Sequence, residues 1–200
     1  MNLESLKVNT NCGKHIAELE AIYRTLDAQL EFFDAKMGIR CNCSSGTCCE
    51  HFVPELSSVE AEYLAYEIYR QDQVEEVLDR LRKYNRSLGV CPLYNKDSIY
   101  HCSFYQGRGL ICRLFGAACF VDKNGNYCFR SCKWNNEKTS LNIEKDKGDF
   151  IPSMGGYGRL LEAIDSNENK MESIEIALLK AINKIGFLLS FNDSPSDIGA

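Results

Sequence analysis

Nine of the eleven cysteines in this 200-residue chain fall into two clusters, and thiolates are the side chains best suited to bind zinc or iron–sulfur clusters. The first cluster is Cys41, Cys43, Cys48 and Cys49, and the second is Cys91, Cys102, Cys112, Cys128 and Cys132. The N-terminal segment lacks the basic start and apolar run of a signal peptide, so we expect a cytoplasmic protein. Disulfides are rare in that compartment. The nine clustered cysteines therefore predict a metal centre.

The spacing of the cysteines excludes the common metal motifs. The sequence has no paired C-x-x-C knuckles, no His pair at zinc-finger spacing and no bacterial ferredoxin run. Nine thiols also exceed the four that one zinc ion or one cubane cluster takes, so two centres, or one centre with a few structural thiols, fit the count. Cys48 and Cys49 are neighbours whose side chains should diverge, and we expect them to reach different metals or different irons. Both zinc and an iron–sulfur cluster stay open, with the cluster favoured.

Four residues outside the nine are weaker candidates. His51 and His101 flank cysteines and could each replace a thiol, although a lone histidine is more often a surface or core residue. Cys119 lies between apolar neighbours and is expected to fill the core, and Cys12 to be an incidental thiol. Five aromatic residues are expected to form an apolar wall that shields the site: Tyr94, Tyr100, Phe104, Tyr105 and Phe115.

Four blocks of the sequence carry a resemblance to a known family. They are the C-x6-C-C of residues 41–49, the C-P-L of residues 91–93, the C-x-F-Y-x-x-R-x-x-x-C-R of residues 102–113 and the C-x-x-x-C of residues 128–132. Together they resemble the YkgJ-type cysteine-cluster family, described as zinc- or iron-chelating proteins, over about residues 25–135. The resemblance implies that the nine clustered cysteines are metal ligands. The family also includes the flagellin lysine methylase, an iron–sulfur enzyme with a longer chain.

Three departures separate the sequence from the family pattern. Ser45 lies where the family has a middle cysteine, and Cys43 could take the role of that cysteine. Gly109 replaces the proline of the family's Arg-Pro pair, and Phe129 replaces a late proline. Arg108 and Arg113 match the motif. They either donate hydrogen bonds to thiolate or sulfide sulfur, or form salt bridges with an acidic residue of a helix, and both alternatives remain open.

We expect a mainly α fold in a single domain, residues 1–200, in which a helical scaffold holds irregular cysteine-rich loops and a small β-hairpin. Apolar residues spaced three and four apart predict helices over 14–37, over 57–88 with a break near 71–73, and over the C-terminal segment 155–191 with an interruption at 165–170. Ser57 and Glu60 have the spacing of a capping box.

The segment that carries the second cysteine cluster has little helical periodicity. Residues 110–115 are expected to be extended, and residues 119–129 to form a β-hairpin with Asn124-Gly125 at its turn. Residues 135–150 are polar and charged, and we expect a surface loop there. The tail from Asn192 is expected to fray.

The composition limits the classes of function. The net charge of −5 disfavours nucleic-acid binding, and the mean hydropathy of −0.29 with no long apolar run disfavours a membrane span. No nucleophile–base pair or phosphate loop stands out. We therefore expect a protein whose partner is a metal ion or cluster, with an accessory, electron-transfer or sensing role. An enzyme related to iron–sulfur lysine methylases, or a structural zinc module for protein interaction, remains an alternative.

Overall fold

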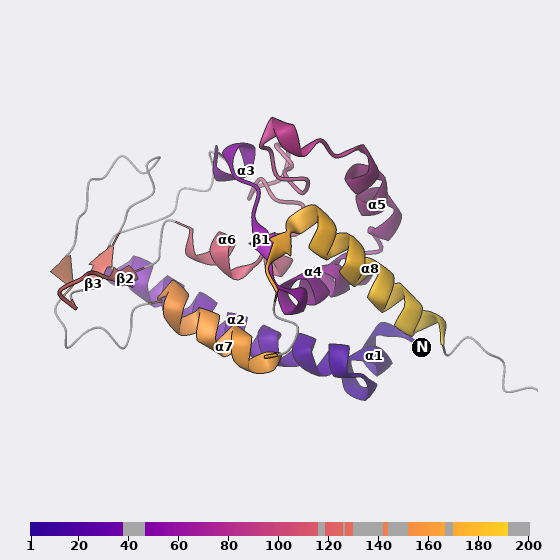
Figure 1. Cartoon of the computed structure of the whole chain (residues 1–200), viewed down its shortest axis with the longest axis horizontal. Coiled ribbons are helices and arrows are strands. Elements are labelled where there is room, and N and C mark those ends of the chain that lie inside the picture. The colour runs from indigo at the N-terminus through magenta and orange to yellow at the C-terminus, as the bar shows by residue number, and fades with distance from the viewer. Residues whose placement is uncertain are drawn as a thin grey trace, which may run out of the picture.

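The computed structural model describes residues 1–37, 47–115, 119–125, 127–129, 142–143, 152–166 and 170–191. Its helices are α1 (Leu3–Asn9), α2 (Asn11–Met37), α3 (Thr47–His51), α4 (Ser58–Arg70), α5 (Val74–Lys83), α6 (Leu110–Leu114), α7 (Met154–Ile164) and α8 (Ile174–Ser190), with short 3-10 turns η2 (Arg86–Leu88) and η3 (Tyr105–Gly107). The strands are β1 (Glu55–Leu56), β2 (Cys119–Val121), β3 (Tyr127–Phe129), β4 (Asn142–Ile143) and β5 (Glu172–Ser173). The mainly α fold with a small hairpin is confirmed (Figure 1).

Helix α4 lies at the centre of the helical body, between α2 and α8. Its side chains from Val59 to Ile68 are all buried, because neighbouring elements cover it on several sides. Fully burying one Leu or Ile side chain contributes about 1.5–3 kcal/mol, so this three-helix contact stabilises the fold. Helix α7 packs along α2, and α1 folds back on the start of α2 (Figure 1).

The start and end of α4 follow the sequence pattern. The Ser57 hydroxyl accepts from the Glu60 backbone N–H, and the Glu60 carboxylate accepts from the Ser57 N–H at 2.8 Å, so the predicted capping box is confirmed. The predicted break is also confirmed, because α4 ends at Arg70 and α5 begins at Val74, with Asp72 between them at a φ of 55°. The interruption near 165–170 likewise separates α7 from α8.

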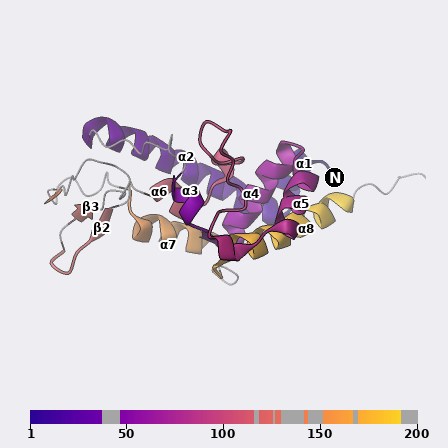
Figure 2. The same ribbon diagram turned by 90° about the horizontal axis from the view of Figure 1, so that it is seen from above.

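The predicted hairpin is formed by β2 and β3, with Phe120 opposite Cys128 and Gly125 at a φ of 80° in the turn. It lies at one end of the molecule and the N-terminus at the other, as the view from above shows (Figure 2). The expectation of a surface loop over 135–150 is wrong at Asn142–Ile143, which pairs with β3 as a third strand. Its pairing with β3 is antiparallel, with Tyr127 opposite Ile143 and Cys128 opposite Asn142.

The expectation of an extended segment at 110–115 is wrong, because residues 110–114 form helix α6. Four further elements were not expected. They are α1, capped by the Asn2 side chain, α3, which lies in a cysteine-rich segment expected to be a loop, and the antiparallel pair of β1 and β5, which joins the chain before α4 to the chain before α8. Among the described residues, no helix has the length and apolar character needed to cross a membrane.

Candidate metal centre

Five of the nine predicted ligands line one cavity of about 70 Å³. They are Cys48, Cys49, Cys91, Cys102 and Cys112. Two belong to the first cysteine cluster and three to the second, so the fold brings these described members of the two clusters together although they are far apart in sequence. The cavity is several times the roughly 10–15 Å³ that a single water needs. We call this space the thiol cavity.

The first pair of thiols comes from the short helix α3. The sulfurs of Cys48 and Cys49 are 3.9 Å apart, so the expected divergence of these neighbours is wrong. Two ligands of one tetrahedral metal with bonds of about 2.3 Å are separated by roughly 3.8 Å. The pair is therefore spaced to share one metal or to bind two adjacent metals.

Helix α3 is fastened to the second cluster through its backbone and one side chain. The Cys91 N–H donates to the Cys49 carbonyl oxygen at 2.9 Å. Next along the chain, the Tyr94 hydroxyl donates to Glu50 Oε1 at 2.6 Å. These two bonds hold Cys91 beside the α3 thiols.

Cys102 is positioned by a tight loop that folds back on residues 93–95. Tyr94 and Cys102 form an isolated β-bridge, and the Ser103 N–H donates to the Leu93 carbonyl oxygen at 3.0 Å. His101 has a φ of 52°, a left-handed conformation that is costly for a non-glycine residue. Arg80 of α5 donates to the Ser103 hydroxyl at 3.0 Å and so ties the loop to the helical body.

Cys112 lies on α6, whose first turn is held by a carboxylate from α4. The Leu110 N–H donates to Glu60 Oε1 at 2.7 Å, and the Tyr23 hydroxyl donates to the same oxygen at 3.1 Å. This buried carboxylate occupies the place of an N-terminal cap, because Gly109 has no side chain to supply one. The tertiary contact explains why residues 110–114 are helical.

A side chain at Gly109 would crowd two buried side chains. A Cβ at this position would be 2.5 Å from Leu56 Cδ2 and 3.1 Å from Glu60 Oε1, so the Leu56 side chain would have to shift. Gly109 therefore allows the start of α6 to approach β1 and α4 closely.

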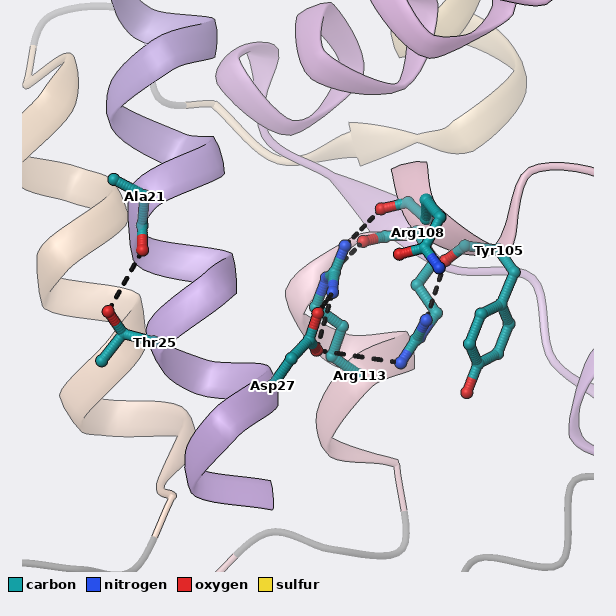
Figure 3. A network of polar contacts seen from close by, with 7 residues as sticks. Ala21, Thr25, Asp27, Tyr105, Arg108 and Arg113 are labelled. Atoms are coloured by element: carbon teal, nitrogen blue, oxygen red, sulfur yellow. Dashed lines mark hydrogen bonds and ion pairs between the residues drawn. The ribbon is translucent and has the colours of Figure 1, made fainter. Parts of the chain in front are cut away.

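The two motif arginines have different surroundings. Arg113 donates to Asp27 of α2 at 2.6 and 2.8 Å and to the Arg108 carbonyl oxygen at 3.0 Å (Figure 3). It also donates to the Gln106 carbonyl oxygen, and its guanidinium lies 4.0 Å from the Tyr23 ring centroid. For Arg113 the salt-bridge alternative is confirmed.

Arg108, by contrast, lines the thiol cavity. It donates to the Tyr105 carbonyl oxygen at 2.8 Å, and its guanidinium lies 3.5 Å from the Tyr105 ring centroid. Its Nη2 is also 4.0 Å from Asp27 Oδ1, as the close view shows (Figure 3).

Burial dominates the electrostatics of the second-cluster thiols. It raises the pKa of Cys91 to about 12 and also raises the pKa values of Cys102 and Cys112. The Cys48 thiol differs, because a hydrogen bond from Cys49 lowers its pKa to about 6 while the pKa of Cys49 rises. Several thiols that ionise only reluctantly need a nearby positive charge to become thiolates.

Aromatic and aliphatic side chains form the rest of the cavity wall. The predicted wall is confirmed for Tyr100, Phe104, Tyr105 and Phe115, which all line the cavity. It is wrong for Tyr94, whose hydroxyl is instead engaged by Glu50. Other residues of the wall, including Phe52, Leu93 and Ile174, were not predicted from the sequence. Their apolar character alone does not distinguish them from ordinary core residues.

The remaining candidates lie elsewhere or outside the described residues. Cys41, Cys43 and Cys132 are outside them, and for Cys119 and Cys128 only the backbone, in β2 and β3, is described. His51 is exposed, and neither it nor His101 lines the cavity. Cys12 is a buried core residue, 3% exposed, away from the cavity.

The five described thiols line one cavity. Within the described ranges, no three His, Cys, Asp or Glu side chains are grouped closely enough to hold a single metal ion. No protein-family model, curated protein or solved structure matches the chain. The resemblance to the YkgJ-type family thus stays a hypothesis that rests on the cysteine-containing blocks.

Proposed function

We propose that this protein binds an iron–sulfur cluster in the thiol cavity and carries it as an accessory protein for electron transfer, cluster delivery or sensing in the cytoplasm. The observation that carries the proposal is the convergence of five thiols from both cysteine clusters on one cavity. Four thiolates are the usual ligand set of a cubane cluster, so the described residues alone supply enough ligands.

The arrangement of the thiols favours a cluster over a single zinc ion. Each iron of a cluster takes its own thiolate, so ligands placed around a cavity suit a polynuclear group. A single zinc ion needs four donors at one point, and no described group of three donors has that spacing. Cys41, Cys43, Cys128 and Cys132 remain candidate ligands for the same centre or a second one.

The chain's other residues would prepare the cavity for such a group. The aromatic wall excludes water, which strengthens electrostatic interactions with the bound centre. The positive charge of Arg108 offsets part of the negative charge of the thiolates. Binding must release the thiol protons, and the raised pKa values of Cys91, Cys102 and Cys112 make loading less favourable at low pH. When bound, an iron–sulfur cluster supplies one-electron redox chemistry.

The direct test is anaerobic purification followed by measurement of iron, acid-labile sulfide and zinc per chain, with a visible absorption spectrum. We expect iron and sulfide in comparable amounts and a charge-transfer absorption that reductant bleaches. The Cys102→Ser variant should lose most of the iron, whereas Cys12→Ser, which changes a core thiol, should retain it.

Stoichiometric zinc without sulfide would replace the proposal with the structural zinc alternative. A metal-free wild-type protein after anaerobic purification and reconstitution would overturn metal binding at this site.

A further inference from the structure

Asp27 is shared by the two motif arginines, one buried and one at the thiol cavity. Arg113, whose side chain is 1% exposed, binds both Asp27 oxygens. Arg108 approaches the same carboxylate with its Nη2 at 4.0 Å. The contact with Arg113 fixes where Asp27 lies, and the longer contact places the negative charge of Asp27 near Arg108 (Figure 3).

Of Asp27 and its two arginine partners, Arg108 is the residue that lines the thiol cavity beside the thiols. Of the cavity's described lining residues, it is the one with a permanent charge. Cys102 and Cys112 line the same cavity as Arg108, so the charge of Arg108 lies beside the second-cluster thiols.

The position of Arg108 is constrained on two sides. The Tyr105 carbonyl oxygen accepts from Nη1 at 2.8 Å, and the Tyr105 ring lies against the guanidinium. The Tyr105 ring in turn stacks on Tyr100, with centroids 4.0 Å apart. A guanidinium held in this way keeps its charge at a constant distance from the cavity. The effect of Arg108 on a bound centre therefore depends on how much of its charge a neighbouring anion compensates.

We propose that Asp27 compensates the charge of Arg108 and so sets the net positive charge experienced by the centre in the thiol cavity. This inference rests on the proposed function. The reduction potential of an iron–sulfur cluster depends on nearby net charge, because a cation stabilises the more negative, reduced form. Asp27 lowers the potential by compensating Arg108, and Arg113 keeps Asp27 in place.

The test is a redox titration of the anaerobically purified holoprotein and its variants. Asp27→Asn removes the compensating charge and should shift the midpoint potential to more positive values. Arg108→Gln removes the cation and should shift the potential to more negative values. The double variant should show about the sum of the two shifts, because the charges of Asp27 and Arg108 each act on the centre.

Two further variants separate this role from a purely structural one. Asp27→Glu restores the charge and should return the potential toward the wild-type value. Asp79→Asn removes an exposed carboxylate that pairs with Lys83 on α5 and should leave the potential unchanged. A structural role alone would reduce cluster content without opposite shifts in potential for Asp27→Asn and Arg108→Gln.

The outcomes distinguish this inference from the proposed function. A wild-type protein with no redox-active centre overturns both. An intact cluster whose potential is the same in wild type and Asp27→Asn, or a double variant that only matches Arg108→Gln, overturns the inference and leaves the proposed function standing.

Discussion

Arg113 Nη1 lies 2.6 Å from Asp27 Oδ2 and joins residues that are 86 positions apart in the sequence. The bond connects α2 to α6 one residue after Cys112. The remaining donors of Arg113 bind carbonyl oxygens of the segment that precedes α6. The buried guanidinium of Arg113, together with the Glu60 carboxylate, thus connects the helical scaffold to one wall of the thiol cavity.

Arg113→Met should destabilise the protein by about 2–4 kcal/mol, because it leaves two carbonyl oxygens and a carboxylate without their donor. The half-exposed Asp27 regains water, so the cost stays below that of breaking a fully buried pair. Urea unfolding monitored by circular dichroism measures the change. The matched control is Arg82→Met on the exposed part of α5, and equal stability of the two variants would contradict this role for Arg113.

Gly109→Ala should disturb the thiol cavity from a position that carries no ligand. The added Cβ would overlap Leu56 Cδ2, and overpacking of this kind costs about 1–3 kcal/mol. The new methyl should displace the start of α6 and lower the bound metal per chain. Gly158→Ala is the control, because its Cβ meets open space in α7 and alanine favours a helix. Equal metal content in both variants would contradict the prediction that a side chain at position 109 disturbs the thiol cavity.

Cys12 should make stability depend on alkaline pH. Burial raises the pKa of its thiol to about 12, above the ordinary value of 9.0. The folded state therefore keeps a proton that the unfolded state loses between these values. The contribution of Cys12 is fully present below pH 9 and declines as pH rises, by at most about 1.4 kcal/mol per pH unit.

The comparison of wild type with Cys12→Ala isolates this effect. The stability advantage of wild type should be constant from pH 7 to about pH 8.5 and should shrink above it. Denaturant titrations of both proteins in reducing, anaerobic buffer provide the measurement. An advantage that is unchanged up to pH 10.5 would indicate that the thiol ionises in the folded protein as readily as in the unfolded chain.

Local sequence patterns predicted the elements that depend on local contacts. The Ser57–Glu60 capping box, the break around Asp72 and the hairpin around Gly125 each have their determinants within a few residues. The residues of the apolar wall were largely predictable as well, because aromatic residues concentrate beside the cysteines.

Features that depend on long-range contacts were not predictable in this way. Helix α6 forms where an extended segment was expected, because Glu60 from α4 caps it, and the sequence around Leu110 does not reveal that partner. The choice between the two roles of Arg113 likewise depended on Asp27, which lies on a distant helix. The 3.9 Å separation of the Cys48 and Cys49 sulfurs was also not predicted, because it depends on the side-chain conformations of these two residues in α3.

The central claim is that both cysteine clusters serve one centre, and the most direct measurement is iron and acid-labile sulfide per chain in Cys49→Ser and Cys112→Ser after anaerobic reconstitution. These residues come from different clusters and line the same cavity. We predict that either substitution removes most of the iron and bleaches the same absorption band, and that the double variant loses no further distinct band. Retention of the full wild-type iron and spectrum by either single variant would contradict the account.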